Sequence, residues 1–204
     1  MGILEVEILF FFDMDLKLIL QIVGVALGLT YLYLEYKANI WLWVVGLIMP
    51  IVHGTLYYRS GLYADFSMQL YYIAAGVYGL LAWSRKSEDS GQLKIAFTPI
   101  CVVPLIIVMY AVAHVVIYWV LVRFTDSTVP FWDSLSTALC IVAYWMLSRK
   151  YVEQWLVWLA VDVITVGLYI YKDIPLTAGL YALYSALAIA GYLRWKRTIK
   201  SEQA

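Results

Sequence analysis

An apolar stretch in the second half of the chain, WLVWLAVDVITVGLYIY, carries one acidic side chain and two tryptophans. Trp155, Trp158 and Asp162 are spaced i, i+3 and i+7, so in a helix they share one face. A carboxylate inside a membrane span costs about 2.5–3.5 kcal/mol on insertion scales, and such a residue is a functional candidate that faces the bundle interior. Two indoles beside a carboxyl group suit a flat cation, through stacking and cation–π attraction. These three residues are therefore predicted to bind a substrate.

A structural role is the alternative for this group of three. Asp162 would then be protonated and bonded to a neighbouring helix, with the tryptophans as packing residues. Gln69 and Tyr72 share a face in the apolar segment 62–84 and are predicted as further substrate contacts, because a buried amide needs partners. Hydrogen bonding between helices is the alternative for Gln69.

The remaining reactive side chains form no catalytic or metal-binding pattern. His53 and His114 lie in different apolar segments without ligand spacing, and Cys101 and Cys140 are expected to pack as small residues. The sequence has no nucleophile–base pair, nucleotide-binding loop or Cys/His cluster. We therefore expect no enzyme activity, no metal and no cofactor, and the net charge of zero does not indicate nucleic acid as a partner.

The elements that position these side chains are expected to be membrane-spanning helices. Hydrophobic residues make up 64% of the 204 residues and charged residues 14%, whereas a soluble domain carries about 25% charged residues. A span needs about 20 apolar residues, and lipid leaves its backbone no hydrogen-bond partner outside the segment. We expect an all-α integral membrane protein embedded in the lipid bilayer. Its seven spans are predicted at about 18–34, 40–58, 62–84, 98–122, 131–148, 152–171 and 175–193.

The basic residues predict the orientation of these spans. With alternating crossings, ten of the fourteen Lys and Arg residues fall on one side of the membrane and four on the other. The side with ten is expected to be cytoplasmic. This assignment places the N-terminus outside and the C-terminus inside the cell.

The chain also repeats itself at an offset of 112 residues. The offset pairs Trp43 with Trp155, Leu56 with Leu168, Tyr57 with Tyr169, Tyr72 with Tyr184, Gly79 with Gly191, Trp83 with Trp195 and Arg85 with Arg197. Because three helices reverse the chain's direction, one extra helix at 98–122 makes the second copy parallel to the first. Such a 3+1+3 arrangement of parallel repeats is the architecture of SWEET-type transporters.

The repeat also defines the expected organisation of the chain. Pro50 occupies the repeat position of Asp162 and is a candidate hinge because it frees the carbonyl of Gly46, with a static kink as the alternative. The expected parts are an outer segment 1–17, a first three-helix bundle 18–84, a cytoplasmic loop and linker helix 85–130, a second bundle 131–197 and a cytoplasmic tail 198–204.

The motifs GLYADFSMQLYYIAAGVYGLLAW and WLVWLAVD, with the later GLYIYKDIPLTAGLYALYSALAIAGY, resemble the PnuC-type vitamin transporters. The resemblance covers nearly all of the chain from about residue 18. It implies a multi-pass protein of the bacterial inner membrane with a SWEET-like fold. It further implies facilitated diffusion of a small unphosphorylated vitamin, which a cytoplasmic kinase traps as a phosphate.

Two departures from the nicotinamide riboside carriers of that family bear on the substrate. Leu80 stands where they typically show a Trp, and Asp162 stands where they show an Asn. Because a carboxyl group can pair with the aminopyrimidine of thiamine, the sequence favours the thiamine-transporting PnuT branch, with nicotinamide riboside as the alternative. A non-transporting membrane receptor or structural protein is a remoter hypothesis, and the sequence does not indicate an oligomeric state.

Overall fold

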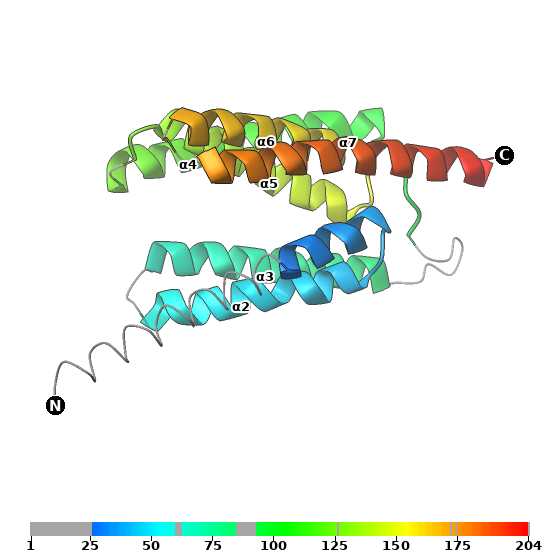
Figure 1. Cartoon of the computed structure of the whole chain (residues 1–204), viewed down its shortest axis with the longest axis horizontal. Coiled ribbons are helices and arrows are strands. Elements are labelled where there is room, and N and C mark those ends of the chain that lie inside the picture. The colour runs from blue at the N-terminus through cyan, green and yellow to red at the C-terminus, as the bar shows by residue number, and fades with distance from the viewer. Residues whose placement is uncertain are drawn as a thin grey trace. The chain divides into compact units, whose positions relative to one another are not determined.

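The computed structural model describes residues 26–59, 63–84, 93–125, 127–171, 173 and 175–203. Residues 26–36 are helical, and the longer helices that follow are α2 (Trp41–Arg59), α3 (Tyr63–Ser84), α4 (Val103–Phe124), α5 (Pro130–Ser148), α6 (Gln154–Tyr171) and α7 (Pro175–Gln203) (Figure 1). A short 3-10 turn, Ile100–Val102, leads into α4. The predicted outer segment 1–17 lies outside the described residues.

A helix lies in each of the seven predicted spans, the first of which is described only from residue 26, so the all-α prediction is confirmed for the described residues. α5 and α7 begin at Pro130 and Pro175, where the fixed φ suits a first turn and the missing N–H costs nothing. Within the described residues, two helical stretches, Ile100–Phe124 and Gln154–Tyr171, are by themselves long and apolar enough to cross a membrane.

The last helix is longer than the predicted span. α7 continues to Gln203, whereas the apolar run ends at residue 193. The residues beyond the run include Arg194, Lys196 and Lys200, and Arg and Lys are good helix formers although they are too polar for lipid. Hydropathy therefore located the apolar part of this helix but not its end.

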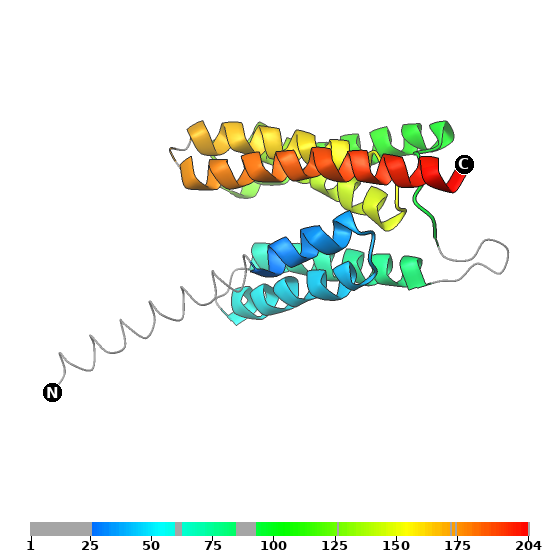
Figure 2. The same ribbon diagram turned by 45° about the vertical axis from the view of Figure 1, so that its right-hand side comes forward.

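The chain divides into two compact units, one through Val77 and the other from Tyr78 onward. In the second unit α7 packs along α6, α6 along α5, and α5 along α4 (Figure 2). The final turns of α3 belong to this unit. The indole Nε1 of Trp83 donates a 3.1 Å hydrogen bond to the carbonyl of Ser148, and the guanidinium of Arg149 lies 5.8 Å from the ring centroid of Tyr78.

Two turns in different units have matching backbone geometry. Ala38 and Lys150, 112 residues apart, have the positive φ values 51° and 55°. The amide of Asn39 donates to the carbonyl of Leu34 at 2.9 Å, and its counterpart Tyr151 donates to Met146 at 3.1 Å. The two turns lead into α2 and α6, which begin at Trp41 and Gln154. The offset found in the sequence therefore also relates hydrogen bonds of the two turns.

Candidate substrate site on α6 and α7

The first turn of α6 is held by the segment that precedes α4. Thr98 donates from its amide and its hydroxyl to Oε2 of Glu153, at 2.8 and 2.6 Å. The amide of Val152 donates to the carbonyl of Ala96 at 3.0 Å, and the amide of Ala96 donates to the carbonyl of Lys150 at 3.1 Å. These bonds fix where α6 starts and so fix the direction of the side chains on its faces.

Asp162 lies near the middle of α6 and is 6% exposed. It makes no hydrogen bond or ion pair with any of the described residues. Its carboxyl group interacts electrostatically with the thiol of Cys140 on α5 and with the hydroxyls of Tyr181 and Tyr184 on α7. A buried polar group is normally paired, so a carboxyl group without a cation beside it is chemically suited to receive a cationic ligand.

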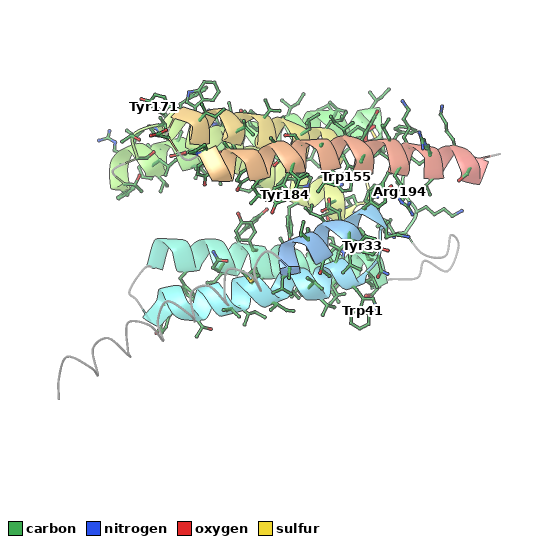
Figure 3. The ribbon with its side chains drawn as sticks, in the orientation of Figure 1. Tyr33, Trp41, Trp155, Tyr171, Tyr184 and Arg194 are labelled. Carbon is green, nitrogen blue, oxygen red and sulfur yellow. The ribbon has the colours of Figure 1, made fainter. Side chains whose placement is uncertain are left out.

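Trp155 and Trp158 share the Asp162 face of α6, as the spacing predicted. Trp155 is 2% exposed and packs edge-to-face on Trp195, with ring centroids 5.8 Å apart at 89°. A Cβ added at Gly191 would lie 2.6 Å from three atoms of the Trp155 indole, so α7 approaches this ring closely. In Figure 3, Trp155 lies nearer Arg194 along α7 than Tyr184 does.

The two indoles differ in their surroundings, although each has a buried Nε1 without a hydrogen-bond partner among the described residues. Trp155 is enclosed by α7, which favours a packing role, whereas Trp158 is only partly buried and lies one helical turn from Asp162. Seven residues of helix place Trp155 about 10 Å along the axis from Asp162, and four place Trp158 about 6 Å away. Trp158 is therefore the indole better placed to share a ligand with Asp162.

Two tyrosines of α7, Tyr181 and Tyr184, interact with the Asp162 carboxyl group but were not among the candidates that the sequence predicted, and Tyr169 of α6 contacts one of them. Tyr169 of α6 stacks on Tyr181 of α7, with ring centroids 5.6 Å apart at 18°. Tyr181 in turn meets Tyr184 edge-on, at 5.7 Å and 78°. The repeat could have found the α7 pair, because Tyr181 and Tyr184 stand 112 residues after the predicted contacts Gln69 and Tyr72.

The other predicted site residues, Gln69, Tyr72 and Pro50, belong to the first unit, whereas Asp162 belongs to the second. Their surroundings are therefore described within the first unit alone. The Cβ of Gln69 is 3.4 Å from a Cβ built on Gly54, so its stem packs against α2. Tyr72 contacts Tyr71 edge-on at 5.5 Å. Pro50 sits inside α2, which stays helical on both sides of it.

Histidine and cysteine form no metal site among the residues that the structure describes. His114 of α4 lies 3.2 Å from the hydroxyl of Ser134 on α5 and stacks on Tyr110, with ring centroids 5.7 Å apart at 7°. These contacts tie α4 to α5. The groups that interact with the Asp162 carboxyl, a thiol and two phenols, are hydrogen-bond donors and so suit recognition of a ligand.

Comparison with known proteins gives one consistent result. The family model described as "Nicotinamide mononucleotide transporter" matches residues 18–197. The nicotinamide riboside transporter PnuC of Escherichia coli (strain K12) is 29% identical over 201 residues, covering 86% of this chain and 84% of that protein. The riboflavin/roseoflavin transporter RibM of Streptomyces davaonensis is 26% identical over 178 residues, covering 86% of this chain and 83% of that protein.

A solved structure shows the same fold. The crystal structure of the vitamin B3 transporter PnuC matches with a TM-score of 0.64 at 22% identity, covering 86% of this chain and 79% of that chain. The matched part of this chain is large enough to include most of the described helices.

Proposed function

Because the chain belongs to the nicotinamide mononucleotide transporter family and is similar to a PnuC protein over most of its length, we propose that it carries a small cationic vitamin across a bacterial inner membrane. The observation that carries the cationic part is the buried Asp162 carboxyl group, which has no ion pair among the described residues. A positive ring beside it supplies the missing charge. Trp158 supplies a π-face, and Trp155, Gln69 and Tyr72 remain proposed contacts.

Nicotinamide riboside is the substrate that the relatives support best. Relatives named as nicotinamide riboside transporters match over most of this chain. The names of these relatives do not mention thiamine, which the sequence favoured. The pyridinium ring of nicotinamide riboside carries a fixed positive charge. Asp162 keeps thiamine as the second candidate, because a carboxyl group can also pair with an aminopyrimidine edge. Riboflavin, named for one relative, lacks a fixed positive charge and is expected to bind poorly beside Asp162.

The proposed topology has the N-terminus outside, the C-terminus inside and 3+1+3 parallel repeats. The ten-to-four distribution of basic residues and the matched turns at Ala38 and Lys150 support it. Transport is proposed as facilitated diffusion, with Pro50 as a hinge and a cytoplasmic kinase trapping the vitamin. No enzymatic step is assigned to the chain.

Binding of nicotinamide riboside, thiamine and riboflavin to the purified protein tests the proposal by calorimetry. We expect a cationic vitamin to bind best and Asp162→Ala to weaken it by roughly 1–3 kcal/mol, because the substitution leaves a polar ligand edge unpaired. Asp162→Asn is expected to be milder, since it keeps the shape and retains an acceptor. Preferential binding of riboflavin, or an Asp162→Ala variant with unchanged affinity, would remove the basis for a cation site.

A further inference from the structure

Tyr181 and Tyr184 of α7, which interact with the Asp162 carboxyl, form together with Tyr169 of α6 a wall of tyrosines to which the proposed transport function assigns no role. Tyr181 and Tyr184 are three residues apart on α7 and therefore lie on one face of that helix. Tyr169 is seven residues after Asp162 and shares its face of α6. The stacked pair Tyr169–Tyr181 and the edge-on pair Tyr181–Tyr184 join these rings into one continuous cluster across the two helices.

The cluster is preorganised by contacts among its own members. Tyr181 is stacked on Tyr169 on one side and meets Tyr184 at 78°, so neither α7 ring can rotate without losing an aromatic contact. All three rings are only partly buried. Fixed aromatic rings beside a carboxyl group present electron-rich faces, and a desolvated ring face binds a cation more strongly than an exposed one.

The opposite end of the α6–α7 interface is closed, which separates it from this wall. There Trp155 fills the space against Gly191 and Trp195. Asp162 also makes no ion pair with the described residues, and the groups that interact with its carboxyl, Cys140, Tyr181 and Tyr184, carry no positive charge.

We propose that Tyr181 and Tyr184 are substrate contacts that make the Asp162 site select a positively charged ring over an uncharged ring of the same shape. This inference rests on the proposed transport function and assigns its selectivity to α7. The tyrosine rings supply the attraction through their faces. Removal of a ring face is therefore expected to weaken the binding of a cation more than the binding of a neutral analogue.

The test uses nicotinamide riboside and its reduced form, which has nearly the same shape but no charge on the ring. Tyr184→Leu keeps the apolar bulk and removes the π-face, and Tyr184→Phe keeps the face and removes the hydroxyl. Tyr181→Leu repeats the test on the neighbouring ring. Tyr171→Leu is the matched control, because Tyr171 lies on α6 and is 76% exposed. Thermal unfolding of each variant in detergent reports whether the fold is intact.

We expect Tyr184→Leu and Tyr181→Leu each to lower the affinity for nicotinamide riboside about tenfold. Both should also lower the preference for the charged form over the reduced form. Tyr184→Phe should stay within about threefold of wild type. If wild type binds nicotinamide riboside and Asp162→Ala weakens it, but both Leu variants match Tyr171→Leu, the tyrosine wall is only packing and the transport function stands. Equal losses for the charged and reduced forms would also overturn the selectivity role. If wild type binds neither nicotinamide riboside nor thiamine, the proposed function itself fails.

Discussion

Gly191→Ala is the substitution whose effect the structure specifies most closely. An alanine Cβ at this position would lie 2.6 Å from three indole atoms of Trp155, whereas ordinary contact begins at 3.4 Å. The indole or α7 must therefore retreat by about 0.8 Å. Trp155 is 2% exposed and also packs on Trp195, so it has little room to do so. Overpacking of this kind typically costs roughly 1–3 kcal/mol.

Gly179→Ala on the same helix is the matched control. A Cβ at Gly179 meets nothing within 4 Å, so only the gain in helix propensity remains there, at most about 1 kcal/mol. Because both substitutions change the propensity alike, their difference reports the clash. Thermal unfolding in detergent should place Gly191→Ala roughly 2–12 °C below Gly179→Ala.

A double variant identifies the partner in this clash. Trp155→Leu creates space beside position 191, so the penalty of Gly191→Ala should shrink in the Trp155→Leu background. Equal melting temperatures for Gly191→Ala and Gly179→Ala, or an unchanged penalty in the double variant, would refute the close approach of α7 to Trp155 and the packing role inferred for that ring.

Three further predictions test the rest of the account. A reporter fused after Ala204 should be cytoplasmic, and a cysteine at Ser127 should be labelled from outside, because the basic residues are distributed ten to four; the reverse pattern would overturn the orientation. Trp158→Ala should weaken a cationic vitamin roughly tenfold in calorimetry, through loss of a π-face, and unchanged affinity would return this indole to packing. Trp83→Phe should remove the 3.1 Å bond to the Ser148 carbonyl and lower stability by about 1 kcal/mol, and unchanged thermal unfolding would contradict a stabilising role for that bond.

The helical part of the fold was predictable because lipid allows few alternatives to helices. Apolar segments located helices such as α5 and α6 to within about two residues at their ends, since a span must satisfy its own backbone. Hydropathy failed at the end of α7, where charged residues continue the helix to Gln203. The family was also predictable, because paired motifs in both halves carry the resemblance and the family model matches residues 18–197.

The site was predictable only in part, because periodicity places residues on a face but does not name the helix that covers it. Trp155 and Asp162 do share a face of α6, yet Gly191 and Trp195 enclose the first while tyrosines lie around the second. Tyr184 was visible in the sequence as the repeat partner of Tyr72 but was not assigned to the site. Its proposed role rests on how α7 packs on α6.

Substrate choice is the least determined by the sequence, because one carboxyl group suits either of two cations. The preference for thiamine rested on two departures, Leu80 and Asp162, whereas the relatives named as nicotinamide riboside transporters favour the alternative. A charge pattern can define the class of ligand. Which ligand of that class fits depends on contacts from several helices.

The central claim is that this chain carries a cationic vitamin past Asp162, and uptake into proteoliposomes tests it most directly. Purified wild type and Asp162→Ala should be reconstituted side by side, with protein-free vesicles as the background. Labelled nicotinamide riboside should equilibrate with the lumen through wild type without an ion gradient, be slowed by excess unlabelled thiamine more than by riboflavin, and enter Asp162→Ala vesicles at least several-fold more slowly. Uptake by wild type at the rate of protein-free vesicles for nicotinamide riboside and for thiamine, or equal rates for wild type and Asp162→Ala, would contradict the account.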